Sequence, residues 1–147
     1  MSLYESEGGG NRPSSGGFGP NDGWDGPPVL VIERSASTRE LMWSVLRSEY
    51  QVQTAATYEE GLRRARTEAY VGIVMSLYPQ DGERAGEMLS ALRDTDAHDT
   101  ASIVAVCGPS LGRDRASLLS GGFDDVLRMP FTQSDLLAVL DRTVQSD

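Results

Sequence analysis

The sequence predicts an α/β fold in which helices cover both faces of a doubly wound, five-stranded parallel sheet, (βα)5 flavodoxin-like in type. Two observations predict this fold. Short apolar runs rich in β-branched residues alternate along the chain with segments whose apolar residues recur at helical spacing. Polar turns separate them, and five such β/α units follow one another. An open parallel sheet of this kind binds ligands at the carboxyl ends of its strands.

Composition excludes several classes of function. The chain has 147 residues, 39% of them hydrophobic, which is enough for one domain with a core. Its formal charge of −9 disfavours binding to nucleic acid or to an anionic membrane through the general surface. All 13 basic residues are Arg, which excludes lysine chemistry. Cys107 is the only cysteine, so no internal disulfide forms, and we expect a cytoplasmic protein without a membrane span.

The chain divides into two parts. Residues 1–28 hold half of the 16 Gly residues and show no hydrophobic periodicity, which predicts a flexible arm or linker. Residues 29–147 are expected to form the domain.

In the first half of the domain, three strands and two helices are expected. The apolar run Val29–Ile32 predicts a strand at the centre of the sheet. The pattern Ser37–Glu40 predicts a capping box that opens a helix over about residues 37–48. The remaining elements are an alternating strand nearer the sheet edge at 51–55, a helix capped by Thr57 and ending near residue 67, and a buried strand at 70–75.

The second half continues the same alternation. The expected elements are a helix at about 84–93, a buried strand at 102–106, a weaker helix at about 112–120, a strand at 123–127 and a last helix that is capped by Thr132–Asp135 and packs through residues 136–144.

The segment that ends the third strand is where chemistry is expected. The apolar run from Ile73 to Leu77 stops at a turn, Tyr78–Gly82, that contains Pro and Gly. No acidic residue stands at the end of this run.

Four segments together resemble a response-regulator receiver domain, over residues 29–145. Val29–Ile32 followed by Glu33 resembles the opening strand and its acidic pair, and Pro79 with Asp81-Gly82 resembles the loop after the phosphoacceptor. Gly121–Leu127 and then Pro130-Phe131 resemble the closing strand and the Lys-Pro-Phe motif.

The resemblance implies a phosphoacceptor Asp, two acids that hold Mg²⁺, a Thr or Ser hydroxyl, a Lys and a switch aromatic. When each of these positions is matched to this sequence, only the first acid, Glu33, is retained, and the other positions hold residues of a different type. The positions are Glu33 and Arg34 for the acidic pair, Met75 for the acceptor with Ser76 beside it, Cys107 for the hydroxyl, Val126 for the aromatic and Met129 for the Lys.

Loss of these groups together indicates a degenerate pseudo-receiver. A divalent cation would meet one carboxylate and one guanidinium, which disfavours metal binding. Met75 and Met129 are expected to fill the space of the phosphoryl group and its partner. Ser76 lacks the cations that an alternative phosphoacceptor needs. Cys107 is interpreted as a small buried hydrophobe, and Glu33 as an ion-pair or helix-terminus carboxylate.

Two classes of function remain. The first, and preferred, is a non-enzymatic signalling module without cofactor or metal, which binds a protein partner independently of phosphorylation or associates with itself. A variant of it retains some phosphorelay input. The second is a small flavodoxin-like cofactor binder, which the absence of a Gly-rich phosphate loop disfavours.

The resemblance also implies a working face on the fourth helix, the fifth strand and the fifth helix. Its candidate residues are Arg113, Arg115, Asp135 and Arg142, whose mixed charges favour oriented polar contacts. Reversing the charges of Arg113 and Arg115 is expected to weaken association and to change stability by no more than about 0.5 kcal/mol.

Overall fold

Five parallel strands form one sheet in the order β3-β2-β4-β5-β6. The computed structural model describes residues 26–95, 101–108 and 115–145. The strands are β2 (Pro28–Ile32), β3 (Gln51–Ala55), β4 (Gly72–Leu77), β5 (Ser102–Cys107) and β6 (Asp125–Arg128). The helices are α1 (Ala36–Leu46), α2 (Tyr58–Thr67), α3 (Ala85–Arg93), α4 (Arg115–Ser120) and α5 (Gln133–Gln145), with a short 3-10 helix η2 (Pro79–Asp81).

The predicted fold class is confirmed, but the predicted position of one strand within the sheet is wrong. The run Val29–Ile32 was expected at the centre of the sheet, whereas β4 is the middle strand and β2 lies between β3 and β4. Strands β2 and β4 are both apolar on their two faces, because helices cover both faces of the sheet. Composition alone therefore does not tell which of the two strands is the central one. Most of the predicted arm, together with Arg113 and the first part of the weaker helix, lies outside the described residues.

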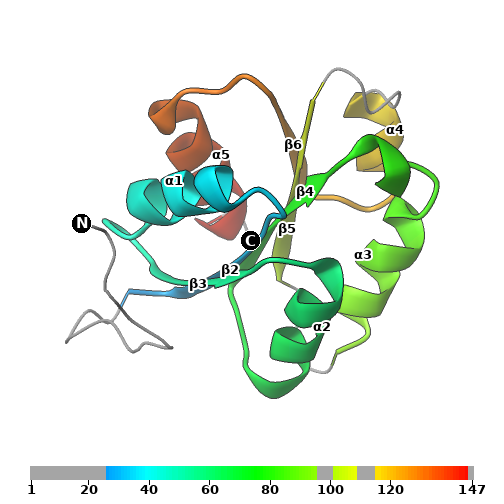
Figure 1. The fold of residues 1–147 in the computed structure, drawn as a ribbon, viewed down its shortest axis with the longest axis horizontal. Coiled ribbons are helices and arrows are strands. Elements are labelled where there is room, and N and C mark those ends of the chain that lie inside the picture. Colours follow the sequence, from blue (N-terminus) through cyan, green and yellow to red (C-terminus); the bar gives the residue numbers. More distant parts are fainter. Residues whose placement is uncertain (1–25, 96–100, 109–114, 146–147) are drawn as a thin grey trace.

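Two apolar layers sandwich the sheet. Helices α1 and α5 cover one face, and α2, α3 and α4 cover the other (Figure 1). Odd and even positions of the inner strands alternate between the two layers, as a pleated strand requires. On β4, Ile73, Met75 and Leu77 contribute to the α2–α3–α4 layer, and Val74 contributes to the α1–α5 layer.

The helix starts follow local capping, with one correction. Ser35, rather than Ser37, caps α1: its Oγ accepts a hydrogen bond from the Thr38 N–H at 3.3 Å. The two predicted caps at Thr57 and at Thr132 are confirmed, because each side chain accepts from the N–H three residues later. Among the described residues, no helix is long and apolar enough to cross a membrane.

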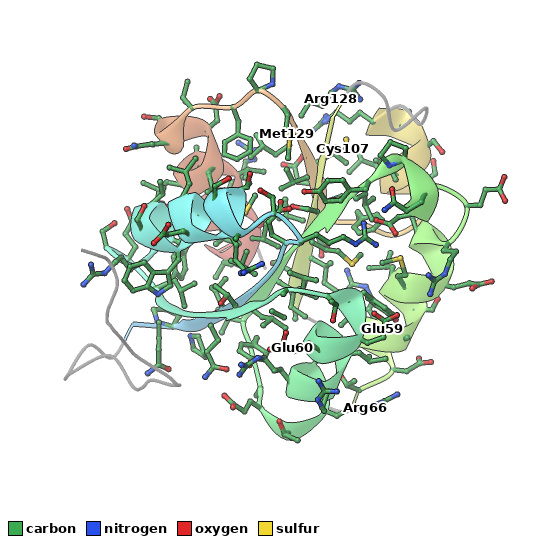
Figure 2. The ribbon with its side chains drawn as sticks, viewed as in Figure 1. Glu59, Glu60, Arg66, Cys107, Arg128 and Met129 are labelled. Carbon is green, nitrogen blue, oxygen red and sulfur yellow. The ribbon has the colours of Figure 1, made fainter. Side chains whose placement is uncertain are left out.

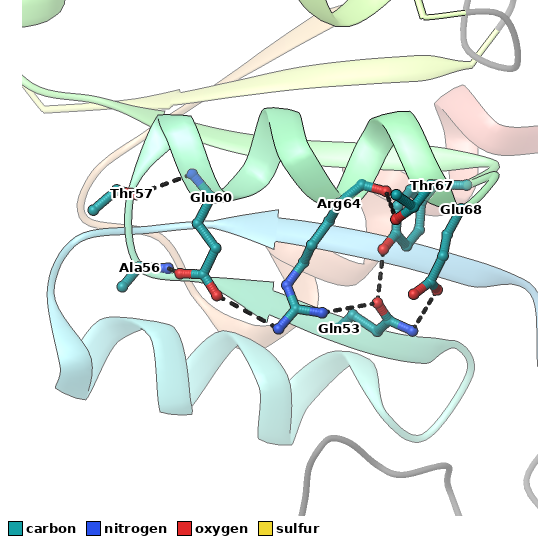
Figure 3. Close-up of polar contacts among 8 residues, drawn as sticks. Gln53, Ala56, Thr57, Glu60, Arg64, Thr67 and Glu68 are labelled. Atoms are coloured by element: carbon teal, nitrogen blue, oxygen red, sulfur yellow. Dashed lines mark hydrogen bonds and ion pairs between the residues drawn. The ribbon is translucent and has the colours of Figure 1, made fainter.

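Polar contacts join α2 to the edge strand β3 (Figure 3). Gln53 lies at their centre: its amide donates to Glu68 at 2.8 Å, and its carbonyl oxygen accepts from Tyr70 at 2.7 Å and from Arg64 at 3.4 Å. Glu60 accepts from the Ala56 N–H at 3.0 Å. These contacts satisfy the side-chain amide of Gln53 on the α2 side of the edge strand.

Gly61 allows α2 to approach β2 closely. A Cβ built on Gly61 would lie 2.4 Å from Cδ1 and 2.7 Å from Cγ1 of Ile32. We expect Gly61→Ala to lower the free energy of unfolding by about 1–3 kcal/mol, the usual cost of overpacking. Gly86→Ala is the matched control, because a Cβ there meets nothing within 4 Å and α3 gains helix propensity. Urea denaturation measures both, and equal effects would contradict the steric account.

Candidate functional site

The candidate site lies where β2 and β4 end, at the carboxyl edge of the sheet. Its central group is the carboxylate of Glu33, which directly follows β2 and is only 1% exposed. Ser76 Oγ donates to one oxygen at 2.5 Å, and the Ser35 N–H donates to the other at 2.9 Å. The hydroxyl of Tyr78 also donates to this second oxygen. Glu33 is thus a helix-terminus ligand, as one of the two sequence interpretations held, and its hydroxyl donors come from β4 and the turn after it.

Arg34, the residue after Glu33, forms a bidentate ion pair with Asp81. The two Nη–Oδ distances are 2.9 and 2.7 Å. Asp81 is 1% exposed and also accepts from the Tyr78 N–H at 2.9 Å. Burial alone would raise the pKa of Asp81, but the hydrogen bonds from Arg34 and the Tyr78 N–H outweigh it and hold this pKa below its ordinary value. The pair ties the β2–α1 turn to η2.

Tyr78 connects the two carboxylates of the site. Its hydroxyl reaches Glu33 and its N–H reaches Asp81, while its ring lies 5.1 Å from the Arg34 guanidinium carbon. Burial and the hydrogen bond to Glu33 raise the pKa of Tyr78 to about 12, so the phenol stays protonated as a donor. We name these five residues, Glu33, Arg34, Ser76, Tyr78 and Asp81, the edge network.

The edge network does not fit a magnesium ion. Mg²⁺ binds in octahedral geometry through one or two carboxylates and several waters, and here the Arg34 guanidinium lies against Asp81, where it repels a cation. Both oxygens of Glu33 and both oxygens of Asp81 already accept hydrogen bonds from protein groups. Within the described part of the chain, no group of three or more His, Cys, Asp or Glu side chains is placed to hold a metal.

The structure separates the two methionines that the sequence analysis placed in one pocket. Met75 is fully buried in the α2–α3–α4 layer, whereas Met129 packs against the α1–α5 layer on the opposite face. They therefore do not fill a common space. Strand alternation explains this result: Ser76, not Met75, points to the side of the sheet on which Glu33 lies.

Cys107 and Val126 belong to the core. Cys107 is 0% exposed at the end of β5, and Val126 lies in the same layer. Register places Arg128 beside Cys107, and Figure 2 shows both at this end of the molecule. Burial nevertheless raises the pKa of Cys107 more than Arg128 lowers it, so the thiol stays protonated, as expected of a buried hydrophobe.

At the predicted interaction face, Arg115 and Arg142 converge on Asp125. Arg115 Nη2 lies 2.5 Å from Oδ1 and Arg142 Nη2 lies 2.6 Å from Oδ2. We name this group the Asp125 clamp. The carboxylate side chain is 8% exposed, so reversing the charge of Arg115 would place two carboxylates together. We therefore expect this reversal to lower the free energy of unfolding by more than the limit of about 0.5 kcal/mol that the sequence suggested. Asp135 instead caps α5, through a hydrogen bond from the Thr132 N–H at 3.0 Å.

The sequence analysis did not identify three residues that take part in these polar groups: Tyr78, Asp81 and Asp125. Asp81 stands beside Gly82 in a turn, where an acid commonly serves the turn itself. One signal was available for Asp81. An arginine at the edge of a buried site needs a counter-charge, and Asp81 is the acid in the neighbouring turn.

Comparisons with known proteins identify the fold. No family model matches the sequence, and no curated protein matches it. Among solved structures, the receiver domain of a sensor histidine kinase from Pseudomonas aeruginosa aligns with a TM-score of 0.70 at 24% identity, covering 83% of this chain and 100% of that chain. That structure has a magnesium ion in its active-site cleft.

Two further structures agree. A chemotaxis response regulator of Vibrio cholerae gives a TM-score of 0.69 at 22% identity over 81% of this chain and 99% of its own. A structure described as an adenylate cyclase from Rhodopirellula baltica gives 0.70 at 16% identity over 82% of this chain and 88% of its own. At these identities the likeness concerns the fold alone. The fold of this chain is therefore the flavodoxin-like fold of response-regulator receiver domains.

Proposed function

We propose that this chain is a receiver-like signalling domain that has lost phosphoryl transfer and binds a protein partner independently of phosphorylation. One observation carries the proposal: Arg34 and Asp81 form an internal ion pair at the edge where a receiver would hold its metal ion. A guanidinium held there supplies a permanent positive charge without a metal. As proposed, the domain is cytoplasmic and catalyses no reaction of its own.

The local chemistry at Glu33 and Ser76 supports this proposal. Phosphoryl transfer to a side chain needs a nucleophile and cations that neutralise the transferring oxygens. The Ser76 hydroxyl contacts the Glu33 carboxylate directly, and its hydrogen bond of 2.5 Å ties it to an anion. An incoming phosphoryl group would meet this anion at close range, which opposes transfer.

We expect acetyl phosphate or beryllofluoride, each with Mg²⁺, to cause no saturable amide shifts around Glu33, Ser76 or Cys107. No phosphoryl adduct should appear in the intact mass. The reason is that Met75, Arg34 and Met129 replace the acceptor, one of the two acidic metal ligands and the counter-cation, so Mg²⁺ should bind no better than it does at a surface carboxylate. Nuclear magnetic resonance and mass spectrometry make the two measurements.

Ser76→Ala is the matched control variant. A mass adduct that disappears in this variant would identify Ser76 as an acceptor and would overturn the proposal in favour of a receiver with residual phosphorelay input. Saturable shifts without an adduct would also overturn it. Yellow colour that follows the purified protein would support the flavodoxin-like alternative.

A further inference from the structure

The two arginines of the Asp125 clamp come from different helices and stay half exposed. Arg115 begins α4 and Arg142 lies in the last turns of α5, on opposite faces of the sheet. They meet at Asp125, the first residue of the edge strand β6. Their side chains are 52% and 61% exposed, so each guanidinium contacts Asp125 with Nη2 and faces solvent over much of its surface.

This arrangement leaves a net positive charge on an acidic protein. Two guanidinium groups share one carboxylate, whereas the whole chain carries a formal charge of −9. Of the nearby described acids, Asp124 pairs with Arg93 at 2.7 Å, and Asp141, beside Arg142 in α5, accepts a hydrogen bond from the Tyr50 hydroxyl. Exposed Arg128 adds a third positive charge at the other end of β6.

We propose that the Asp125 clamp is the contact surface for a short acidic segment of a protein partner. This inference rests on the proposed function and names the chemistry of its partner. Guanidinium groups bind carboxylates through paired, charge-assisted hydrogen bonds. Asp125 already holds both arginine side chains in place, so less side-chain entropy is lost when a partner binds.

The negative charge of the rest of the chain favours a short acidic segment over a nucleic acid or a second copy of this chain. A nucleic acid would extend its phosphates beyond the clamp and over acidic surface, which opposes binding. A second copy of this chain would bring another formal charge of −9 and would be repelled at long range. A short acidic segment carries few charges and engages only the clamp.

The probe is a fluorescein-labelled peptide of alternating Glu and Ser, and its matched control is the same peptide with Gln in place of Glu. Anisotropy titrations at low salt should show binding of the Glu peptide alone. Arg142→Gln should weaken binding roughly fivefold, whereas Arg66→Gln, at an exposed arginine of α2 (Figure 2), should change it less than twofold. Arg142→Lys should lie between, since it keeps the charge and loses the paired geometry.

Arg142→Gln should remain folded because Arg115 still neutralises Asp125, and its thermal unfolding checks this. Equal weakening by Arg142→Gln and Arg66→Gln would overturn the proposal, because it would indicate diffuse attraction. Failure of the Glu peptide to bind would overturn it as well. Self-association that Arg142→Gln abolishes, without peptide binding, would identify a second copy as the occupant.

The same titration with acetyl phosphate and Mg²⁺ separates this inference from the proposed function. Binding of equal strength with and without these reagents supports both. Peptide binding that appears only with acetyl phosphate and Mg²⁺ would support the Asp125 clamp as the contact surface. It would overturn the proposal that partner binding is independent of phosphorylation. Absence of binding under both conditions would overturn the surface while leaving the tests of phosphoryl transfer unaffected.

Discussion

Replacing Arg115 and Arg142 together by glutamine should lower the free energy of unfolding by about 2 kcal/mol, whereas either single replacement should lower it by less than about 1 kcal/mol. Asp125 is buried, and each arginine alone still neutralises it. Only the double variant leaves this carboxylate without a cation. The expected loss is smaller than that of a fully buried pair because both arginines are half exposed and water screens them.

Urea denaturation of the four proteins of this double-mutant cycle measures the coupling. Adding Asp125→Asn to the double variant is the control, since it removes the stranded charge and should recover part of the loss. Strictly additive single effects would show that the two arginines act independently, and would contradict the shared-carboxylate account.

Replacing Arg34 by glutamine should lower the free energy of unfolding by about 2 kcal/mol near neutral pH. The replacement leaves the buried carboxylate of Asp81 with the Tyr78 N–H and without its bidentate partner. The Arg34 side chain is 38% exposed, and water access there keeps the expected loss below that of a fully buried pair. Arg66→Gln, on the exposed surface of α2, is the matched control and should have almost no effect.

This loss should depend on pH. The pKa of Asp81 is lower in the folded protein than in the unfolded chain, where it is about 3.9. Stabilisation by Arg34 is therefore fully present above about pH 5 and disappears as the pH falls through the folded pKa. The difference between wild type and Arg34→Gln should shrink towards zero on acidification. A difference that stays constant down to about pH 2 would show that Arg34 acts through packing and not through its charge.

A stable edge network gives the proposed signalling role a physical basis. The carboxylates of Glu33 and Asp81 both accept hydrogen bonds from groups of the chain itself, and Arg34 also balances the charge of Asp81. The Asp125 clamp joins α4, β6 and α5 in the same way. As proposed, partner binding then depends on a surface that is already formed.

The sequence by itself determined the order of the elements, the fold class and most of the core. These follow from local patterns: the apolar runs of the inner strands, the helical spacing of Met42, Val45 and Leu46, and caps such as Thr57. The edge position of β3 also followed from its alternation of apolar and polar residues. The sequence did not determine that Ser35 caps α1, because Ser37 carries an equivalent side chain two residues later.

Only the tertiary structure decided which polar groups meet. Ser76 reaches Glu33 across 43 positions of the chain, and Asp81 reaches Arg34 across 47. Parallel pairing of β2 with β4 brings these residues together, and strand alternation selects Ser76 over Met75. The same holds for Asp125, whose two arginines lie on helices from opposite faces of the sheet. Sequence patterns report the environment of each segment, whereas pairs distant in sequence depend on register and packing that no local pattern encodes.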